Sequence, residues 1–183
     1  MSPAPAGAER QPVSPDDLAA VIVQLGRPVR AVRAVAHRCS CGQPDVLTTE
    51  PELPDGTPFP TLYYLTCPRA TSAIGTLEAD GVMREMAQRL AVDPELAAAH
   101  RAAHESYLAQ REQLGHVEHI AGISAGGMPD RVKCLHVLVA HSLAVGPGVN
   151  PLGDEALALL AARGITADSA WGGAPGGCVP GDA

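Results

Sequence analysis

The sequence predicts an α+β protein in which a small N-terminal antiparallel β-sheet, with cysteines in its turns, packs on a mainly helical C-terminal part. Up to residue 67, short runs of Val, Tyr, Leu and Thr alternate with turn residues, which is typical of strands. From residue 68 onward, apolar residues recur at helical spacing, and Pro, Asp and Gly stand at the expected helix ends. Aromatic residues make up only 3% of the chain, so Ala, Val and Leu must build the core.

The first expected helix covers residues 15–25. Ser14 is a suitable N-cap, and Pro15 suits the first helical position because an N–H there would have no partner within the helix. The two aspartates that follow favour the positive end of the helix, and Gly26 is suited to ending it.

Three strands are expected next, over residues 29–36, 45–49 and 61–67. The third is the clearest because it is rich in Tyr, Leu and Thr. Several prolines and the turn signal Pro54-Asp55-Gly56 separate it from the second strand. Pairing of these strands would form the sheet.

The remainder is expected to be helical. The predicted helices cover residues 70–79, 82–91, 93–114, 129 or 130 to 145, and 154–162. Residues 115–128 are expected to form a loop. The domain organisation predicted from these patterns is a disordered leader over 1–13, a single α+β domain over 14–163 and a disordered tail, rich in Gly and Pro, over 164–183.

The net charge of −7 argues against a general nucleic-acid-binding protein and against a role on anionic membranes, because both functions require basic surfaces. No apolar run approaches the ~20 residues that a membrane-spanning helix needs. The N-terminus has no apolar stretch of the kind found in secretory signals. We therefore expect a cytoplasmic protein, whose five cysteines are free or metal-bound rather than paired in disulfides.

Four of the five cysteines are candidates for one metal site. Cys39 and Cys41 stand in a turn, Cys67 ends the third strand, and Cys134 stands early in the fifth expected helix. If the strands pair, the first three thiols converge at one end of the sheet, and Cys134 closes a four-thiolate shell. Zinc is the expected ion, and an iron–sulfur cluster is the alternative because it also accepts four thiolates. Cys178 is left out because it lies in the expected tail.

Two histidines share one face of the helix over 93–114. His100 and His104 are four residues apart, a spacing that can grip a metal, but the glutamate of the HExxH zinc motif is missing between them. His100 aligns with the apolar stripe, so we interpret it as a core histidine. His104 lies at the edge of the stripe and is the better candidate for a polar role.

Helix geometry also constrains the histidines near Cys134. In a regular helix, Cys134 and His136 point to nearly opposite sides. Cys134 and His141 share a face but lie about 10 Å apart along the axis. Neither histidine is therefore expected to join Cys134 on one metal ion in a regular helix, and both are interpreted as helix-packing, surface or hydrogen-bonding residues.

A glycine pair before the fifth expected helix is a candidate anion site. Gly126 and Gly127 precede the predicted helix N-terminus, and Arg131 and Lys133 follow in its first turns. Backbone N–H groups in such a position attract phosphate or carboxylate. The P-loop pattern is absent, and the alternative interpretation is a glycine hinge followed by a solvated basic turn.

Several segments resemble the bacterial family catalogued as domain of unknown function 501, over about residues 29–152. The segments are Arg38-Cys39 with Gly42 and Pro44, the run 53–68, Ala103-His104-Glu105 with Tyr107 and Arg111, and Val132-Lys133-Cys134-Leu135-His136. The resemblance implies cysteines matching Cys39, Cys67 and Cys134, whereas the position of Cys41 is often another residue. It thereby implies, as an alternative, a three-cysteine site completed by His104, His136 or water.

The resemblance also implies a setting. Genes of the family commonly lie near those for a septum-formation initiator and an exopolyphosphatase. A protein partner linked to cell division or polyphosphate metabolism is therefore expected, with no nucleic acid and no membrane.

Three functions follow as hypotheses. The first is a metal-binding protein whose Cys-rich site has a mainly structural or regulatory role. The second is a metal-assisted enzyme acting on a phosphorylated or otherwise anionic small molecule, with His104 or His136 as acid or base. The third is a thiol redox sensor in which Cys39 and Cys41 form the reactive pair. If the cysteines are ordinary buried thiols, the sequence indicates little chemistry.

Overall fold

A three-stranded antiparallel sheet and six α-helices form the described part of the chain, which comprises residues 11–173 and residue 178 of the computed structural model. The strands are β1 (Val32–Arg38), β2 (Pro44–Thr49) and β3 (Tyr63–Leu65). The α-helices are α1 (Pro15–Leu25), α2 (Pro68–Ala79), α3 (Val82–Val92), α4 (Pro94–Glu112), α5 (Leu135–Val145) and α6 (Pro151–Ala161), and the short 3-10 helices are η1 (Glu118–Ile120) and η2 (Ala170–Gly172). The predicted α+β architecture is confirmed.

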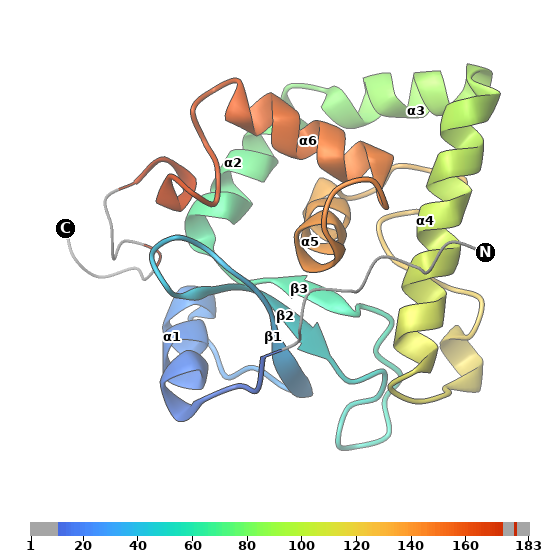
Figure 1. Cartoon of the computed structure of the whole chain (residues 1–183). Coiled ribbons are helices and arrows are strands. Elements are labelled where there is room, and N and C mark those ends of the chain that lie inside the picture. Colours follow the sequence, from blue (N-terminus) through green and yellow to red (C-terminus); the bar gives the residue numbers. More distant parts are fainter. Residues whose placement is uncertain (1–10, 174–177, 179–183) are drawn as a thin grey trace.

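The sheet forms a layer between α1 and the other helices (Figure 1). Its strand order is β1-β2-β3, and all six residues of β2 are buried. Successive side chains of a strand point to opposite faces, so Val46 joins the main core while Leu47 packs with Val21 of α1. This burial on both faces explains why β2 is apolar or uncharged at all but one position.

Helix α5 runs through the centre of the molecule, with α6, α2 and the sheet around it (Figure 1). Most of its residues are buried, and they lie all round the helix. A helix that is apolar on every side is stable only when it is covered on every side. The position of α5 therefore dictates where the surrounding elements must pack.

The expected helices over 15–25, 70–79, 82–91 and 93–114 agree with α1 to α4 to within two residues at each end. The third strand, expected over 61–67, is shorter. Helix α6 begins earlier than the expected residue 154, because the Asn150 side chain accepts the N–H of Gly153 and caps the helix.

The largest correction concerns the start of α5, expected at residue 129 or 130. The chain instead folds back on itself, since Lys133 N–H donates to Gly126 O at 2.7 Å and Arg131 N–H donates to Gly127 O at 2.9 Å. Gly127 has a φ of +92°, and a Cβ there would lie only 2.8 Å from Arg131 O. Cys134 is extended and is the N-cap rather than a residue within the helix.

Both expected disordered ends are partly packed. Gln11 exchanges two backbone hydrogen bonds with Val35 at the edge of β1. Residues 164–173 lie against the sheet and α2, and Trp171 in this segment is 4% exposed. Residues 11–13 of the expected leader and 164–173 of the expected tail thus pack on the domain, and residues 1–10, 174–177 and 179–183 lie outside the described residues.

No helix in the described ranges is long and apolar enough to cross a membrane.

Replacing Gly153 with Ala should destabilise the fold. A Cβ at Gly153 would lie 2.2 Å from Leu138 O and 2.4 Å from Ser142 Oγ, so α6 must move away from α5. Overpacking of this kind costs about 1–3 kcal/mol. Gly75→Ala is the matched control, because a Cβ on this helical glycine meets nothing within 4 Å and should be neutral or stabilising. Urea unfolding measures both; equal midpoints for the two variants would contradict the close helix contact.

The buried His141 should make the fold sensitive to acid. Its ring stacks on Tyr63 at 5.7 Å and meets Tyr107 edge-on at 5.2 Å, and burial lowers its pKa from 6.5 to about 4. Between these two values the unfolded chain binds a proton that the folded chain does not. Stability is therefore lost as the pH falls from 6.5 to 4, by up to about 3 kcal/mol from this residue.

His141→Phe should flatten this pH dependence. Urea midpoints at pH 7.5 and 4.5 test the expectation, with the exposed His119→Gln as control. An unchanged difference between the two pH values in His141→Phe would show that other groups cause the acid sensitivity.

Candidate functional site

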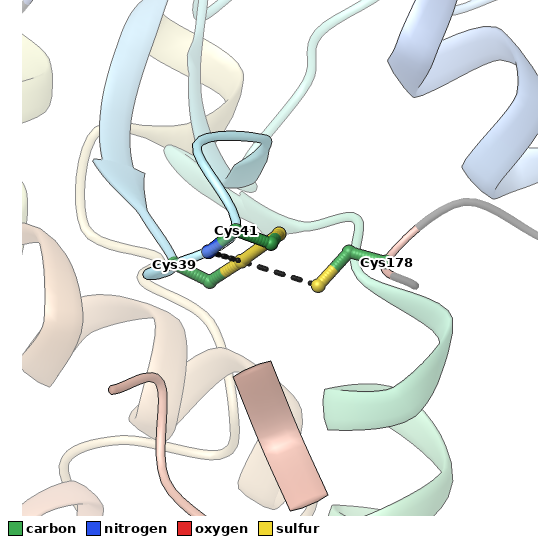
Figure 2. A group of neighbouring side chains, drawn as sticks. All are labelled: Cys39, Cys41 and Cys178. Atoms are coloured by element: carbon green, nitrogen blue, oxygen red, sulfur yellow. Dashed lines mark hydrogen bonds between the residues drawn. A yellow bond between two sulfur atoms is a disulfide. The ribbon is translucent and has the colours of Figure 1, made fainter. Parts of the chain in front are cut away.

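Three sulfur atoms lie together at the turn between β1 and β2. Cys39 and Cys41 are joined by a disulfide, and Cys178 Sγ lies 3.1 Å from Cys39 Sγ (Figure 2). All three sulfur atoms lie within 4.8 Å of one another. Cys39 and Cys178 are buried, while Cys41 is half-buried. Such a group could hold a metal ion.

The turn that carries the first two cysteines is held from both sides. Gly42 has a φ of +84° and donates its N–H to Cys39 O at 2.9 Å. Arg38 binds Gly42 O at 3.2 Å and pairs with the buried Asp17 of α1 at 2.6 Å. The Arg38 guanidinium holds the pKa of Asp17 well below its usual range, so this pair is ionised at any ordinary pH. The guanidinium charge of Arg38 is therefore paired with Asp17.

Cys178 reaches the turn because the chain before it is docked on the sheet. Trp171 Nε1–H donates to Asp45 Oδ2 at 3.2 Å, and Ser40 N–H in the cysteine turn donates to Ala167 O at 3.1 Å. Arg69 at the start of α2 adds a contact to Ala170 O at 3.5 Å. Cys178, which the sequence analysis leaves out as part of the expected tail, therefore lies in the sulfur group.

Cys67 lies beside Cys178 of this group. It is the N-cap of α2 and is fully buried. Burial, together with the neighbouring Cys67 thiol and against the opposing effect of Arg69, raises the pKa of Cys178 to about 12. Cys178 is therefore a neutral thiol near pH 7 unless a cation takes the place of its proton.

Cys134 belongs to a different group, with Glu78 and His136, whose ligand atoms lie within 4.8 Å of one another. Because Cys134 is an extended N-cap, its side chain does not point away from His136 as a regular helix would require. Cys134 Sγ lies 3.8 Å from His136 Nδ1. The structure thus divides the four predicted ligands: Cys39, Cys41 and Cys67 lie near Cys178, and Cys134 does not join them.

Charge separation stabilises this second group. Burial acts against the Cys134 thiolate, but hydrogen bonds from His136 and the Val137 N–H outweigh it and lower the pKa of Cys134. The hydrogen bond with Cys134 raises the pKa of His136 to about 9, against the effect of burial, and Glu78 adds to the rise. The pair thus favours thiolate and imidazolium.

The other predicted polar residues lie apart from both groups in the described structure. His104 Nδ1 lies 2.8 Å from Ser124 Oγ. His100 is fully buried, as expected of a core histidine.

The predicted anion site does not form. Gly126 and Gly127 precede a folded-back loop rather than a helix N-terminus, and Arg131 and Lys133 are exposed. The first N–H of α5, from Leu135, donates to Glu78 Oε1 at 2.7 Å. A carboxylate of the protein thus occupies the position that an anion would take.

The model of the family described as "Protein of unknown function (DUF501)" matches residues 35–158. The chain belongs to this family. The resemblance noted in the sequence is therefore confirmed. The matched residues include Cys39, Cys41 and Cys67, as well as Glu78, Cys134 and His136, but the match ends before Cys178. No curated protein and no solved structure matches the chain.

One signal could have revealed the role of Cys178. Trp171 is the single tryptophan of the chain and stands in a segment rich in Gly. A large apolar side chain in such a segment needs a place on the core, and a segment docked through it lies near the folded domain.

Trp171→Ala should expose Cys178. The variant loses the hydrogen bond to Asp45 and the apolar contacts of the buried indole ring. A loss of about 1.4 kcal/mol in docking free energy is enough for a tenfold rise in the fraction of molecules in which this segment is undocked. We expect iodoacetamide to label Cys178 at least about tenfold faster, as measured by peptide mass spectrometry. Trp171→Phe, which keeps most of the apolar contact, is the control. Equal labelling of Trp171→Ala and the unchanged protein would show that Trp171 does not hold Cys178 in place.

Proposed function

We propose that this DUF501 protein is a metal-binding protein in which Zn²⁺ is held by the thiolates of Cys39, Cys41 and Cys178, with Cys67 as the fourth ligand. The supporting observation is the gathering of sulfur atoms from cysteines 139 positions apart in the chain. In a tetrahedral zinc site, a Zn–S distance of about 2.3 Å places the sulfur atoms roughly 3.8 Å apart. Three sulfur atoms within 4.8 Å of one another need only small movements to reach this spacing.

The spacing favours a single ion over an iron–sulfur cluster. The four cysteines of a cluster are distributed over two or four iron atoms, and sulfur atoms on different irons lie farther apart than the ligands of one ion. Cys39, Cys67 and Cys178 are each at most 3% exposed. A closed four-thiolate site of this kind is structural, and here it ties the C-terminal segment to the β1–β2 turn and to α2.

Redox state decides whether the ion binds. The Cys39–Cys41 disulfide must first be reduced to two thiolates by two electrons from a small thiol such as glutathione, which is itself oxidised to its disulfide, because only the thiolates bind the metal. Zinc binding then releases the proton of Cys178, so the affinity rises with pH below the raised pKa of this thiol.

The disulfide itself favours a second candidate function, a thiol–disulfide switch. Attack of the Cys178 thiolate on Cys39 Sγ would form a Cys39–Cys178 bond and release Cys41 as a thiolate, with no net oxidation. This exchange requires deprotonated Cys178, whose raised pKa slows the reaction near pH 7. We therefore place metal binding first.

Elemental analysis tests the proposal. Protein prepared anaerobically with a reductant should lose one equivalent of zinc when Cys178 is replaced by Ser, and the affinity for that equivalent should fall by at least about tenfold. Ser40→Ala is the matched control, since this exposed side chain lies in the same turn and is not a ligand. Equal zinc in the unchanged protein and in Cys178→Ser would contradict the site. Zinc-free reduced protein in which glutathione disulfide produces the Cys39–Cys178 bond would establish the switch instead.

A further inference from the structure

We propose that Glu78, Cys134 and His136 form a second zinc site, separate from the sulfur group, with one coordination position open to a ligand. The three residues supply one oxygen, one sulfur and one nitrogen atom. Catalytic zinc sites typically have three protein ligands and water in the fourth position, whereas structural sites have four protein ligands. This inference does not depend on the proposed function of Cys39, Cys41 and Cys178.

The distances between the ligand atoms agree with one tetrahedral ion. With Zn–S of about 2.3 Å and Zn–N or Zn–O of about 2.0 Å, tetrahedral angles place sulfur and nitrogen roughly 3.6 Å apart and nitrogen and oxygen roughly 3.3 Å apart. The structure has Cys134 Sγ 3.8 Å from His136 Nδ1. It has His136 Nδ1 3.2 Å from Glu78 Oε1.

Hydrogen bonds with the backbone orient two of the ligands, His136 and Glu78. His136 Nε2 lies 3.1 Å from Thr71 O, and since a carbonyl only accepts, Nε2 carries the proton. In the neutral ring this leaves the lone pair of Nδ1 facing Cys134 and Glu78. Glu78 Oε1 accepts the Leu135 N–H at 2.7 Å, which fixes the carboxylate at the start of α5. Metal-binding histidines and carboxylates characteristically have such partners.

The charges also suit a divalent cation. One thiolate and one carboxylate carry two negative charges, and a neutral imidazole adds none, so Zn²⁺ makes the site neutral.

The site is open on one side. The side chains of His136 and Glu78 are 26% and 23% exposed. An adjoining open pocket of about 240 Å³ is lined by His136, Thr71, Thr61, Tyr63 and Tyr64, and by two apolar residues. None of the described residues that line it is a lysine or an arginine, so it suits a small neutral ligand rather than a phosphorylated one.

Metal counting separates the two sites. Reduced protein should bind two equivalents of zinc, with one lost in Cys178→Ser, the other lost in His136→Ala, and both lost in the double variant. Glu78→Gln is the second test of the new site, because it keeps an acceptor for the Leu135 N–H and should still weaken the second equivalent at least about tenfold. His119→Ala, an exposed histidine outside both groups, is the control.

The open position is tested with Co²⁺ in the Cys178→Ser variant. In this variant the first site is expected to lose its ion, so the Co²⁺ spectrum reports on the second site. We expect a visible spectrum of a low-coordinate ion with one thiolate ligand, and a shift of its bands when imidazole, a neutral ligand, is added. Full zinc content in both His136→Ala and Glu78→Gln would overturn the site, whatever Cys178→Ser does. A cobalt spectrum that imidazole leaves unchanged would overturn the open position. Rapid alkylation of Cys134 in protein that binds no metal there would show an activated thiol instead.

Discussion

The burial of α5 is the constraint on which the rest of the structure depends. Its residues are apolar almost throughout, so no side of this helix can face water without a large cost. The sheet, α2 and α6 cover it, and Gly153 lets α6 approach within direct backbone contact. At the start of α5, the side chains that could bind a metal ion are those of its N-cap, Cys134, and of His136. Because the helix is fixed on all sides, these two residues are fixed against Glu78 of α2 as well.

A second constraint, the buried Asp45, positions the sulfur group. Asp45 is fully buried, and its two carboxylate oxygens bind different partners, His37 at 2.7 Å and Trp171 at 3.2 Å. A buried carboxylate without such partners would be costly, so the sheet favours the docking of Trp171. The C-terminal segment is thereby held near the β1–β2 turn, and Cys178 follows it there. Packing and electrostatics, rather than a bond between cysteines, bring this thiol to Cys39.

Much of the fold could be predicted because periodicity reports local structure directly. Helices α1 and α4 begin at side-chain caps, Ser14 and Asp93, and α1 to α4 all have apolar residues at helical spacing. The three strands have β-branched and aromatic residues between turn signals. The start of α5 could not be predicted in the same way. Pro129 and Asp130 resemble a helix start, but hydrogen bonds from Arg131 and Lys133 back to the two glycines close a loop instead. Those bonds depend on the glycines having positive φ, which the sequence pattern does not show.

The division of the cysteines between the two groups was only partly predictable, for the same reason. The convergence of Cys39, Cys41 and Cys67 at one end of the sheet follows from strand pairing, which sequence patterns do indicate. Whether Cys134 or Cys178 lies near these three depends on two other features. One is the extended N-cap conformation that turns Cys134 toward His136, and the other is the long-range docking of Trp171 on Asp45. Residue spacing reveals neither feature, although the single tryptophan in a Gly-rich segment is a signal for the second, so spacing alone grouped Cys134 with the cysteines of the turn.

Helix α2 connects the two groups and also keeps them independent. Cys67 is its N-cap, while Thr71 and Glu78 lie on it and contact His136. A rise of about 1.5 Å per residue places Cys67 and Glu78 roughly 16 Å apart along the axis, where two unit charges interact by only about 1 kcal/mol at an effective dielectric constant of about 20. Neutralising the charge of one group therefore changes the field at the other only slightly. Any coupling between the groups must act through movement of α2 itself, and the burial of Ala70, Ile74 and Leu77 in the main core opposes such movement.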